Sequence, residues 1–413
     1  MLKSELLELI ANGENSGVEF KRDDVRPEQL AREVVALANF QGGRILLGVE
    51  DDGTITGIQR TDLETWVMDT IFTRYVHPLI LPFYEELALD DGKRVAVVSL
   101  SQGTAKPYVL RHREREEIYV RVGSTSRLAT REQQARLFAL GGLLHTEILP
   151  VSGTKLRDLS LERVEDYLLH RVGDTEVPTT DAAWKERLIG LGFMVEQDHG
   201  PALCSIAGLA LFGRAPRHHL PQAGLRWMAF EGDSMEYRAL DDAVIDGPLV
   251  VLSQGGLGER HQLVEPGLLE RLIDRITPFV STDPAALDGT GSLQRERKWH
   301  YPLEAVREAV INALVHRDWT RLPEVEVVSY ADRLEVTSPG ALQNSMTLAK
   351  MLAGQRSPRN PLLVEVMRDY GYVEARGMGV RRKIVPLVRE ASGQEARFEA
   401  TEDYVRVILP RSP

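Results

Sequence analysis

The sequence lacks the features of secreted and membrane-spanning proteins. Its 413 residues include a single cysteine, Cys204, which excludes an internal disulfide and fits a reducing compartment. No stretch has the ~18 uninterrupted apolar residues of a membrane helix. The segment Met1–Ile10 lacks the basic start and continuous apolar core of a signal peptide. We therefore expect a cytoplasmic protein with no membrane partner, in which Cys204 is an inert core thiol.

An excess of positive charge is also absent. The net charge of -11 at pH 7 excludes a protein that binds polyanions through its overall charge, so any nucleic-acid contact must be a local basic surface. What is present is ordinary for globular domains: 43% hydrophobic and 27% charged residues. The length predicts two or three domains.

Helical and strand patterns occur along the whole chain and predict a multi-domain α+β protein. We expect a mixed domain over 1–142, a middle connecting region over 143–295 and a C-terminal α/β sandwich over 296–413. The middle region contains helix patterns followed by a Gly-Phe step and a small apolar unit. It is either a winged-helix-like fragment or a packing subdomain that spaces the two ends.

The stretch from 13 to 57 combines strand, helix and acidic signals. Pro27 suits the first position of a helix, and the apolar spacing after it predicts an amphipathic helix over 27–40. The apolar run Ile45–Val49, bounded by Gly-Gly and Asp-Asp-Gly, predicts a buried strand that ends in a turn. The acidic residues after this strand could converge with the strand that contains Glu19 and Lys21. Carboxylates that meet in this way suit a divalent cation, because hard cations prefer oxygen ligands.

These residues carry a family resemblance. The motif residues are Glu14, Glu19-Phe20-Lys21, Asn39, Gly42-Gly43, Gly48-Val49-Glu50-Asp51, Lys106-Pro107-Tyr108 and the stretch 119–127. Together they resemble the Schlafen AlbA-type domain, whose nuclease-competent members use two glutamates and an aspartate as a metal-dependent RNA-cleaving site. The resemblance implies catalytic and metal-binding roles for Glu14, Glu19 and Asp51. Lys21 lies beside them, and Mg²⁺ or Mn²⁺ would be the metal.

Basic residues cluster toward the end of this first segment. They are Arg111, His112, Arg113, Arg115, Arg121, Arg127, Arg131 and Arg136. The cluster is either a solvated face whose charges are offset by neighbouring glutamates or an edge that contacts phosphates. The resemblance favours the second interpretation for Arg121 and Arg127, with Ser124 as a further donor to nucleic acid.

A second informative block begins near residue 300. Pro302 again suits a helix start, and Glu308 and Asn312 are four apart, so they project from one helix face with His316 a further turn along. Such a polar stripe on an otherwise apolar helix predicts a ligand site. Farther on, Gly377 and Gly379 form a Gly-x-Gly turn before a basic helix start, where backbone amides suit phosphate.

This order of helix, strand pair, Ser338-Pro339-Gly340 turn and Gly-x-Gly turn resembles the GHKL, or histidine-kinase-like, ATPase fold of RecG-like transcriptional regulators. In that superfamily the helix glutamate polarises the attacking water and the asparagine holds magnesium, which implies these roles for Glu308 and Asn312. ATP and Mg²⁺ are the implied cofactors. The residues implied in nucleotide binding are Asn312, His316, Asp318, Asp332, Gly340, Gly377 and Gly379. The Asp-x-Gly-x-Gly motif of the superfamily is replaced here by Asp332 and Ser338-Pro339-Gly340. We therefore expect nucleotide binding without fast hydrolysis.

Three hypotheses follow from the two resemblances. The chain is a regulator in which ATP at the C-terminal domain controls nucleic-acid binding, to RNA or DNA, by the N-terminal domain. Alternatively it is a metal-dependent nuclease with a tRNA-type substrate, acting in stress or phage defence, or a structural module whose pseudo-ATPase domain mediates dimerisation. In each case we expect a homodimer.

Overall fold

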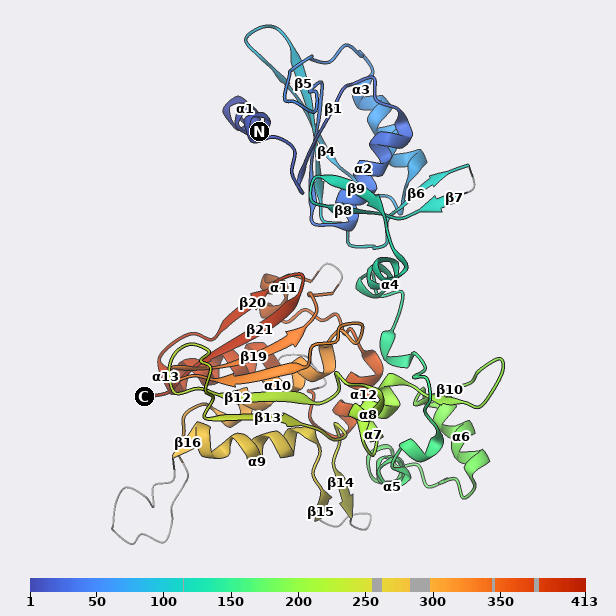
Figure 1. The fold of residues 1–413 in the computed structure, drawn as a ribbon, viewed down its shortest axis with the longest axis vertical. Helices are drawn as coiled ribbons and strands as arrows, with labels where there is room; N and C mark the ends of the chain where they lie inside the picture. The colour runs from blue at the N-terminus through green and yellow to red at the C-terminus, as the bar shows by residue number, and fades with distance from the viewer. Residues whose placement is uncertain (114, 255–261, 283–297, 344–345, 375–378) are drawn as a thin grey trace. The chain divides into compact units, whose positions relative to one another are not determined.

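The computed structural model describes residues 1–113, 115–254, 262–282, 298–343, 346–374 and 379–413 (Figure 1). They form two compact units, Met1–Leu144 and His145–Pro413. Helices and strands are present in both units, which confirms the predicted α+β class. Within these ranges, no helix is both long and apolar enough to cross a membrane.

A four-stranded sheet is the centre of the first unit. Its strand order is β1-β2-β5-β4. The strands are β1 (Val18–Lys21), β2 (Gly42–Leu47), β4 (Phe83–Ala88) and β5 (Arg94–Ser101). The β1–β2 pair is parallel and the other two pairs are antiparallel. A parallel pair requires a crossover, which the helix α2 (Pro27–Asn39) supplies as its sequence predicted.

The two faces of this sheet are covered by different helices. Leu30, Val34 and Leu37 of α2 pack with side chains of one face. Leu6 of α1 (Lys3–Asn12) packs with Phe20 and the other side chains of the opposite face. Successive strand residues point to opposite faces, so both helices find apolar partners on the same strands.

Smaller elements complete the first unit. They are α3 (Leu63–Thr65), the π-helical segment Trp66–Tyr75, β3 (Val76–His77), β6 (Val109–His112), β7 (Arg115–Glu117), β8 (Tyr119–Val122), β9 (Thr125–Leu128) and α4 (Arg131–Leu140). Buried Asn39 holds β8 and the residue before β6 to α2: its Nδ2 donates to the carbonyl oxygens of Tyr108 and Tyr119, and its Oδ1 accepts from the amide of Tyr108.

A six-stranded sheet is the centre of the second unit. Its order is β13-β12-β18-β19-β21-β20. The strands are β12 (Leu225–Ala229), β13 (Asp241–Ile245), β18 (Val325–Ser329), β19 (Arg333–Pro339), β20 (Arg397–Ala400) and β21 (Tyr404–Pro410). Only the β12–β18 pair is parallel. Since β12 and β13 come from the expected middle region, one sheet crosses the expected boundary at residue 295.

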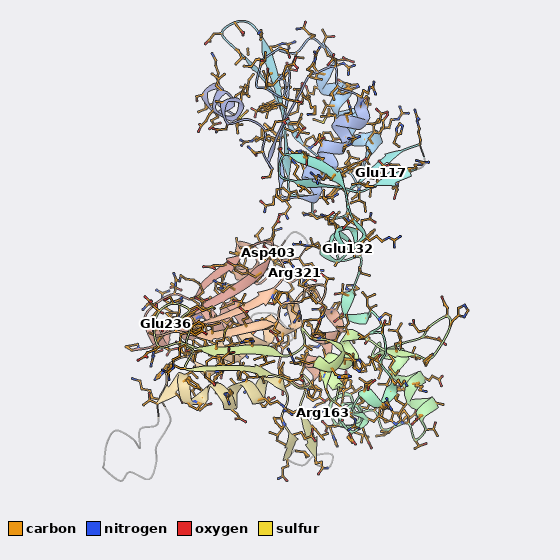
Figure 2. The ribbon with its side chains drawn as sticks, viewed as in Figure 1. Glu117, Glu132, Arg163, Glu236, Arg321 and Asp403 are labelled. Atoms are coloured by element: carbon orange, nitrogen blue, oxygen red, sulfur yellow. The ribbon has the colours of Figure 1, made fainter. Side chains whose placement is uncertain are left out.

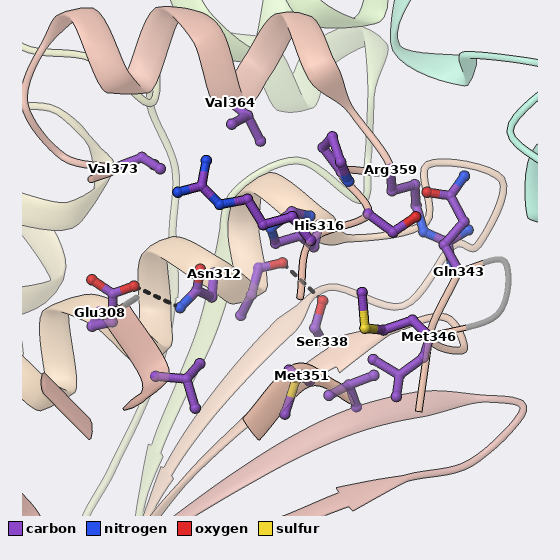
Figure 3. A pocket seen from close by; sticks show the side chains of 18 of the residues that line it. Glu308, Asn312, His316, Ser338, Gln343, Met346, Met351, Arg359, Val364 and Val373 are labelled. Atoms are coloured by element: carbon purple, nitrogen blue, oxygen red, sulfur yellow. Dashed lines mark hydrogen bonds between the residues drawn. The ribbon is translucent and has the colours of Figure 1, made fainter. Parts of the chain in front are cut away.

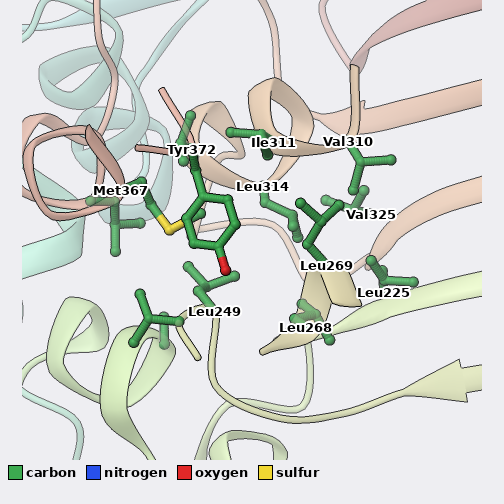
Figure 4. Packing of buried hydrophobic residues seen from close by; sticks show 14 of the residues in the cluster. Leu225, Leu249, Leu268, Leu269, Val310, Ile311, Leu314, Val325, Met367 and Tyr372 are labelled. Carbon is green, nitrogen blue, oxygen red and sulfur yellow. The ribbon is translucent and has the colours of Figure 1, made fainter. Parts of the chain in front are cut away.

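One face of this sheet carries the helices α9 (Leu268–Val280), α10 (Leu303–His316) and α13 (Val385–Ser392). Figure 4 shows side chains of α9 and α10 packed against Leu225 and Val325 of the strands. This two-layer arrangement agrees with the predicted α/β class, but β12, β13 and α9 come from the expected middle region. An ion pair of 2.9 Å joins Arg321, in the loop before β18, and Asp403, in the loop before β21 (Figure 2).

The remaining elements of the second unit are short. They are α5 (Leu161–Asp166), the π-helical segment Tyr167–Val172, α6 (Asp181–Gly190), β10 (Met194–Val195), β11 (Leu203–Cys204), α7 (Ile206–Phe212), α8 (Pro216–His219), β14 (Leu252–Gln254), β15 (Gln262–Glu265), β16 (Ser281–Thr282), β17 (Lys298–Trp299), α11 (Leu348–Leu352) and α12 (Pro361–Asp369). Trp184, Phe193 and Phe212 belong to the same core as the sheet, so the helical region packs against the sandwich. Cys204 is buried there, and burial raises the pKa of its thiol to about 11, as expected of an inert thiol.

Candidate functional site

A cavity of about 570 Å³ opens in the second unit (Figure 3). Its wall combines one face of α10, the end of β19, the following loop, α12 and the segment that begins at Gly379. Apolar side chains such as Met346, Met351 and Val364 line part of the wall, and polar and charged side chains line the rest. A concave, mainly apolar site with a few placed polar groups is the usual form of a small-molecule site.

The helix α10 presents its polar stripe to this cavity. Glu308, Asn312 and His316 lie on the wall, whereas Val310 and Leu314 on the other side of the helix are buried in the core. The Nδ2 of Asn312 donates a hydrogen bond of 2.9 Å to Oε1 of Glu308 (Figure 3). The amide nitrogen is therefore engaged, and the carbonyl oxygen of Asn312 is the atom left to ligate a cation.

The two titratable side chains of the stripe have shifted pKa values. Burial raises the pKa of Glu308, and the hydrogen bond from Asn312 offsets this only in part. His316 lines the cavity and is exposed (Figure 3). Desolvation and the charge of Arg359 lower the pKa of His316 to about 4, so its imidazole is neutral at pH 7.

Two predicted glycines lie where a side chain would not fit. A Cβ on Gly379 would overlap the carboxylate of Glu308, so any other residue there would displace that carboxylate. Gly340 has a φ of 109° and lies against Asp318, which excludes other residues both by conformation and by space. Both glycines line the cavity, whereas Gly377 lies outside the described residues.

The structure does not place the predicted aspartates Asp318 and Asp332 on the cavity wall. Asp318 is buried behind Gly340, where its carboxylate accepts hydrogen bonds from Thr320 and pairs with Arg359 at 3.2 Å. Asp332 lies in the β18–β19 turn and pairs with Arg333 at 2.8 Å. Their positions depend on long-range packing, which motif spacing does not encode.

The sequence analysis missed the contribution of α12 to the cavity. Pro361, Val364, Glu365 and Arg368 share one face of this helix and all line the wall. Just before it, Arg359 donates to the carbonyl oxygen of Ala341 and so ties the helix start to the loop after β19. The three-and-four spacing along 361–368 was the available signal for this face.

In the first unit, the predicted carboxylates come together around a lysine. The ammonium group of Lys21 lies 2.6 Å from Glu19, 3.6 Å from Asp51 and 3.8 Å from Glu14. Burial lowers the pKa of Lys21, but the hydrogen bond to Glu19 and the charges of the three carboxylates outweigh it, so the net shift is upward. Burial raises the pKa of Glu14, although a hydrogen bond from the amide of Phe20 favours its charged form.

This cluster does not form the predicted metal-ligand set. Lys21 lies where the carboxylates converge, and its positive charge would repel a divalent cation there. Across the described ranges, no group of three His, Cys, Asp or Glu side chains is placed to hold one ion. The arrangement fits an internal ion cluster, and neither Mg²⁺ nor Mn²⁺ fits it while Lys21 stays in place.

Arg121 is part of the same cluster and is not available to phosphate. Its side chain is fully buried and lies 2.6 Å from Glu19 and 3.0 Å from Glu33. It also donates to the carbonyl oxygens of Asn15 and Val18. Arg121 therefore holds β8 to β1 and α2, and the prediction that it contacts nucleic acid is not compatible with this burial.

Ser124 and Arg127, the other predicted nucleic-acid contacts, are exposed on the β8–β9 hairpin. Of the three predicted nucleic-acid contacts, Arg121 is therefore buried in the fold, whereas Ser124 and Arg127 are accessible to a ligand.

Comparisons with known proteins match the two units separately. The family model described as "Schlafen, AlbA_2" matches residues 14–130. The model described as "Putative ATP-dependent DNA helicase recG C-terminal" matches residues 323–409. The chain therefore combines a domain similar to Schlafen AlbA_2 with a domain similar to the RecG C-terminal ATPase-like domain, and these similarities connect it with nucleotides and nucleic acids. The helix α10 precedes the second match, so its role at the cavity is assigned from geometry.

No curated protein matches the chain. Among solved structures, the DIP2311 protein from Corynebacterium diphtheriae is similar, with 21% identity over 99% of this chain and 80% of that chain. The TM-score of 0.42 makes this similarity too distant to assign a fold.

Proposed function

We propose that this protein is a nucleotide-responsive nucleic-acid-binding regulator. ATP with Mg²⁺ occupies the cavity of the second unit, and its binding controls nucleic-acid binding by the first unit in a homodimer. The observation that carries the proposal is the Glu308–Asn312 pair on the wall of a large cavity, with Gly379 packed directly against the glutamate. An acid and an amide paired in this way serve no evident packing purpose on a core helix.

The residues present fit a magnesium nucleotide. The free carbonyl oxygen of Asn312 would hold Mg²⁺, which would neutralise phosphate charge. The apolar wall around Met346, Met351 and Val364 would accept the base by desolvation. Glu308 would orient water, but its carboxylate is already engaged by Asn312 and its raised pKa disfavours the charged form, so we expect slow hydrolysis.

Calorimetry of ATP binding tests this proposal. Asn312→Ala should weaken Mg²⁺-dependent ATP binding by at least tenfold, because it removes the cation ligand. The exposed Gln262→Ala on β15 is the matched control and should bind as the wild type does. Equal affinities of Asn312→Ala and wild type, with and without EDTA, would contradict the assignment.

Control of the first unit by nucleotide is a separate measurement. Fluorescence anisotropy of labelled single-stranded RNA and DNA should give different affinities with and without ATP and Mg²⁺, and Asn312→Ala should abolish that difference. If wild type bound nucleic acid with the same affinity with and without ATP and Mg²⁺, regulation would be rejected, but nucleotide binding would not.

A metal-dependent nuclease is the second candidate, because Glu14, Glu19 and Asp51 lie within 3.8 Å of one point; a metal could take that point only if the Lys21 ammonium left it. Its test uses Asp51→Asn, since Asp51 is 81% exposed and its removal should leave the fold intact. Cleavage of labelled tRNA with Mg²⁺ or Mn²⁺ that disappears in Asp51→Asn would establish the nuclease. Intact RNA in both proteins would favour binding.

A further inference from the structure

A row of residues crosses the sheet of the first unit at one end. In the strand register Val18 of β1 is paired with Arg44 of β2, Arg44 with Ser99 of β5, and Ser99 with Phe83 of β4. Residues paired in this way project from the same face of a sheet. The row therefore places an arginine, a serine and a phenylalanine side by side.

The helix α1 covers part of this face: Val18 of the row is buried in the same cluster as Leu6, whereas Arg44, Ser99 and Phe83 remain partly or fully exposed. Its side chains pack on the next row of the same face, which contains Phe20, Leu46 and Val97. Beyond it lies a hollow of about 530 Å³. We call this hollow the sheet-end groove; its side-chain wall is formed by Arg44, Leu81, Phe83, Ser99 and Ser101.

Arg44 is an uncommitted cation in this groove. It is exposed, and no described residue pairs with its guanidinium or accepts a hydrogen bond from it. The nearest carboxylate in the adjacent row, Glu85, is paired with the terminal ammonium of Met1 at 2.7 Å. The groove thus has local positive charge despite the acidic chain.

Phe83 and Leu81 give the groove an apolar wall that remains in water. Phe83 is 65% exposed and Leu81 is 79% exposed. An exposed aromatic ring beside a cation offers a stacking surface for an unpaired base, while the cation contacts its phosphate. The hydroxyl groups of Ser99 and Ser101 add hydrogen-bonding partners along the same wall.

We propose that the sheet-end groove binds single-stranded nucleic acid, with a base stacked on Phe83 and a phosphate on Arg44. The proposal rests on the nucleic-acid function proposed above and names the surface that performs it. Single strands are the expected class, because the bases of a duplex are stacked on each other and do not present a face to Phe83. The groove lies on the α1 face of the sheet. The Lys21 cluster lies on the opposite face, which α2 covers and where Glu33 of α2 pairs with Arg121.

The test measures binding of a labelled 12-nucleotide single strand to the full chain by fluorescence anisotropy, at several salt concentrations. Phe83→Ala should weaken binding about tenfold, and Phe83→Trp should retain it, because stacking energy follows the aromatic face. Arg44→Gln should lower the slope of log K against log salt by about 0.7, the value for one phosphate contact on a single strand.

Matched substitutions elsewhere in the same unit provide the controls. Phe138→Ala and Arg26→Gln change exposed residues of the same unit that do not line the groove, so both should bind as wild type does. Circular dichroism should show that Phe83→Ala and Arg44→Gln are folded, as expected from their exposure.

The outcomes separate the two proposals. If wild type binds neither RNA nor DNA, the nucleic-acid function itself fails. If it binds but Phe83→Ala and Arg44→Gln match wild type, the groove assignment alone is overturned. Equal losses for a duplex and a single strand would also overturn it, since they would show that no unpaired base is stacked. Normal nucleic-acid affinity together with lost self-association in Phe83→Ala would reassign the groove to a protein contact.

Discussion

The buried carboxylate of Glu147 is predicted to set both the stability of the second unit and its dependence on pH. Its two oxygens accept hydrogen bonds of 2.9 and 3.0 Å from the amides of Leu362 and Leu363, in the first turn of α12. Because α12 forms part of the cavity wall, this cap also positions the candidate nucleotide site.

The magnitude follows from burial. Glu147 is 1% exposed, so Glu147→Ala leaves two amides without their acceptor at a cost of about 2–5 kcal/mol. Desolvation raises the pKa of Glu147 from 4.5 to about 7, although both hydrogen bonds favour the charged form. Between these values the folded protein binds more protons than the unfolded chain, so the free energy of unfolding falls as pH rises. A pKa difference of this size corresponds to about 3 kcal/mol of stability.

The assay is urea unfolding at pH 5 and pH 8, followed by tryptophan fluorescence. Trp184, Trp227, Trp299 and Trp319 lie in the second unit, so the signal reports mainly on it. Glu147→Gln, which cannot ionise, should lose the fall in stability that wild type shows between the two pH values.

The exposed Glu390→Gln on α13 is the control and should keep the wild-type dependence. The reasoning would be refuted if Glu147→Gln kept the same slope as wild type, or if Glu147→Ala unfolded at the wild-type urea concentration.

Three further outcomes follow from the two sites. Gly379→Ala should weaken ATP binding at least tenfold in calorimetry, because its methyl group displaces the Glu308 carboxylate; unchanged affinity would contradict that contact. Arg121→Ala should destabilise the first unit by about 3–5 kcal/mol in thermal or urea unfolding, because it removes the buried cation that lies between Glu19 and Glu33; a loss under about 1 kcal/mol would show that these ion pairs are not needed. His316→Ala should change ATP affinity by the same factor at every pH between 6 and 8, because the pKa of His316 is about 4 and its ring stays neutral in that range. If wild-type affinity varied with pH there and His316→Ala removed the variation, His316 would titrate in that range.

Local chemistry made several elements predictable from the sequence. Pro27 begins α2 as predicted, and Thr130 caps α4 by accepting a hydrogen bond from the amide of Gln133, three residues along the chain. The four-residue spacing of Glu308 and Asn312 placed both on one helix face, and the side chains are hydrogen-bonded there. These features depend on residues within a few positions of one another, so sequence periodicity and capping patterns determine them.

Tertiary structure alone decided where distant residues meet. Arg121 resembled a surface cation in the sequence, but partners about a hundred residues away enclose it, because its strand packs over α2 and β1. Asp318 was assigned to nucleotide and instead pairs with Arg359 behind the cavity. The sheet-end groove depends on the register of four strands and on where α1 stops. Strand register and helix coverage arise from packing across the chain, and no short motif records them.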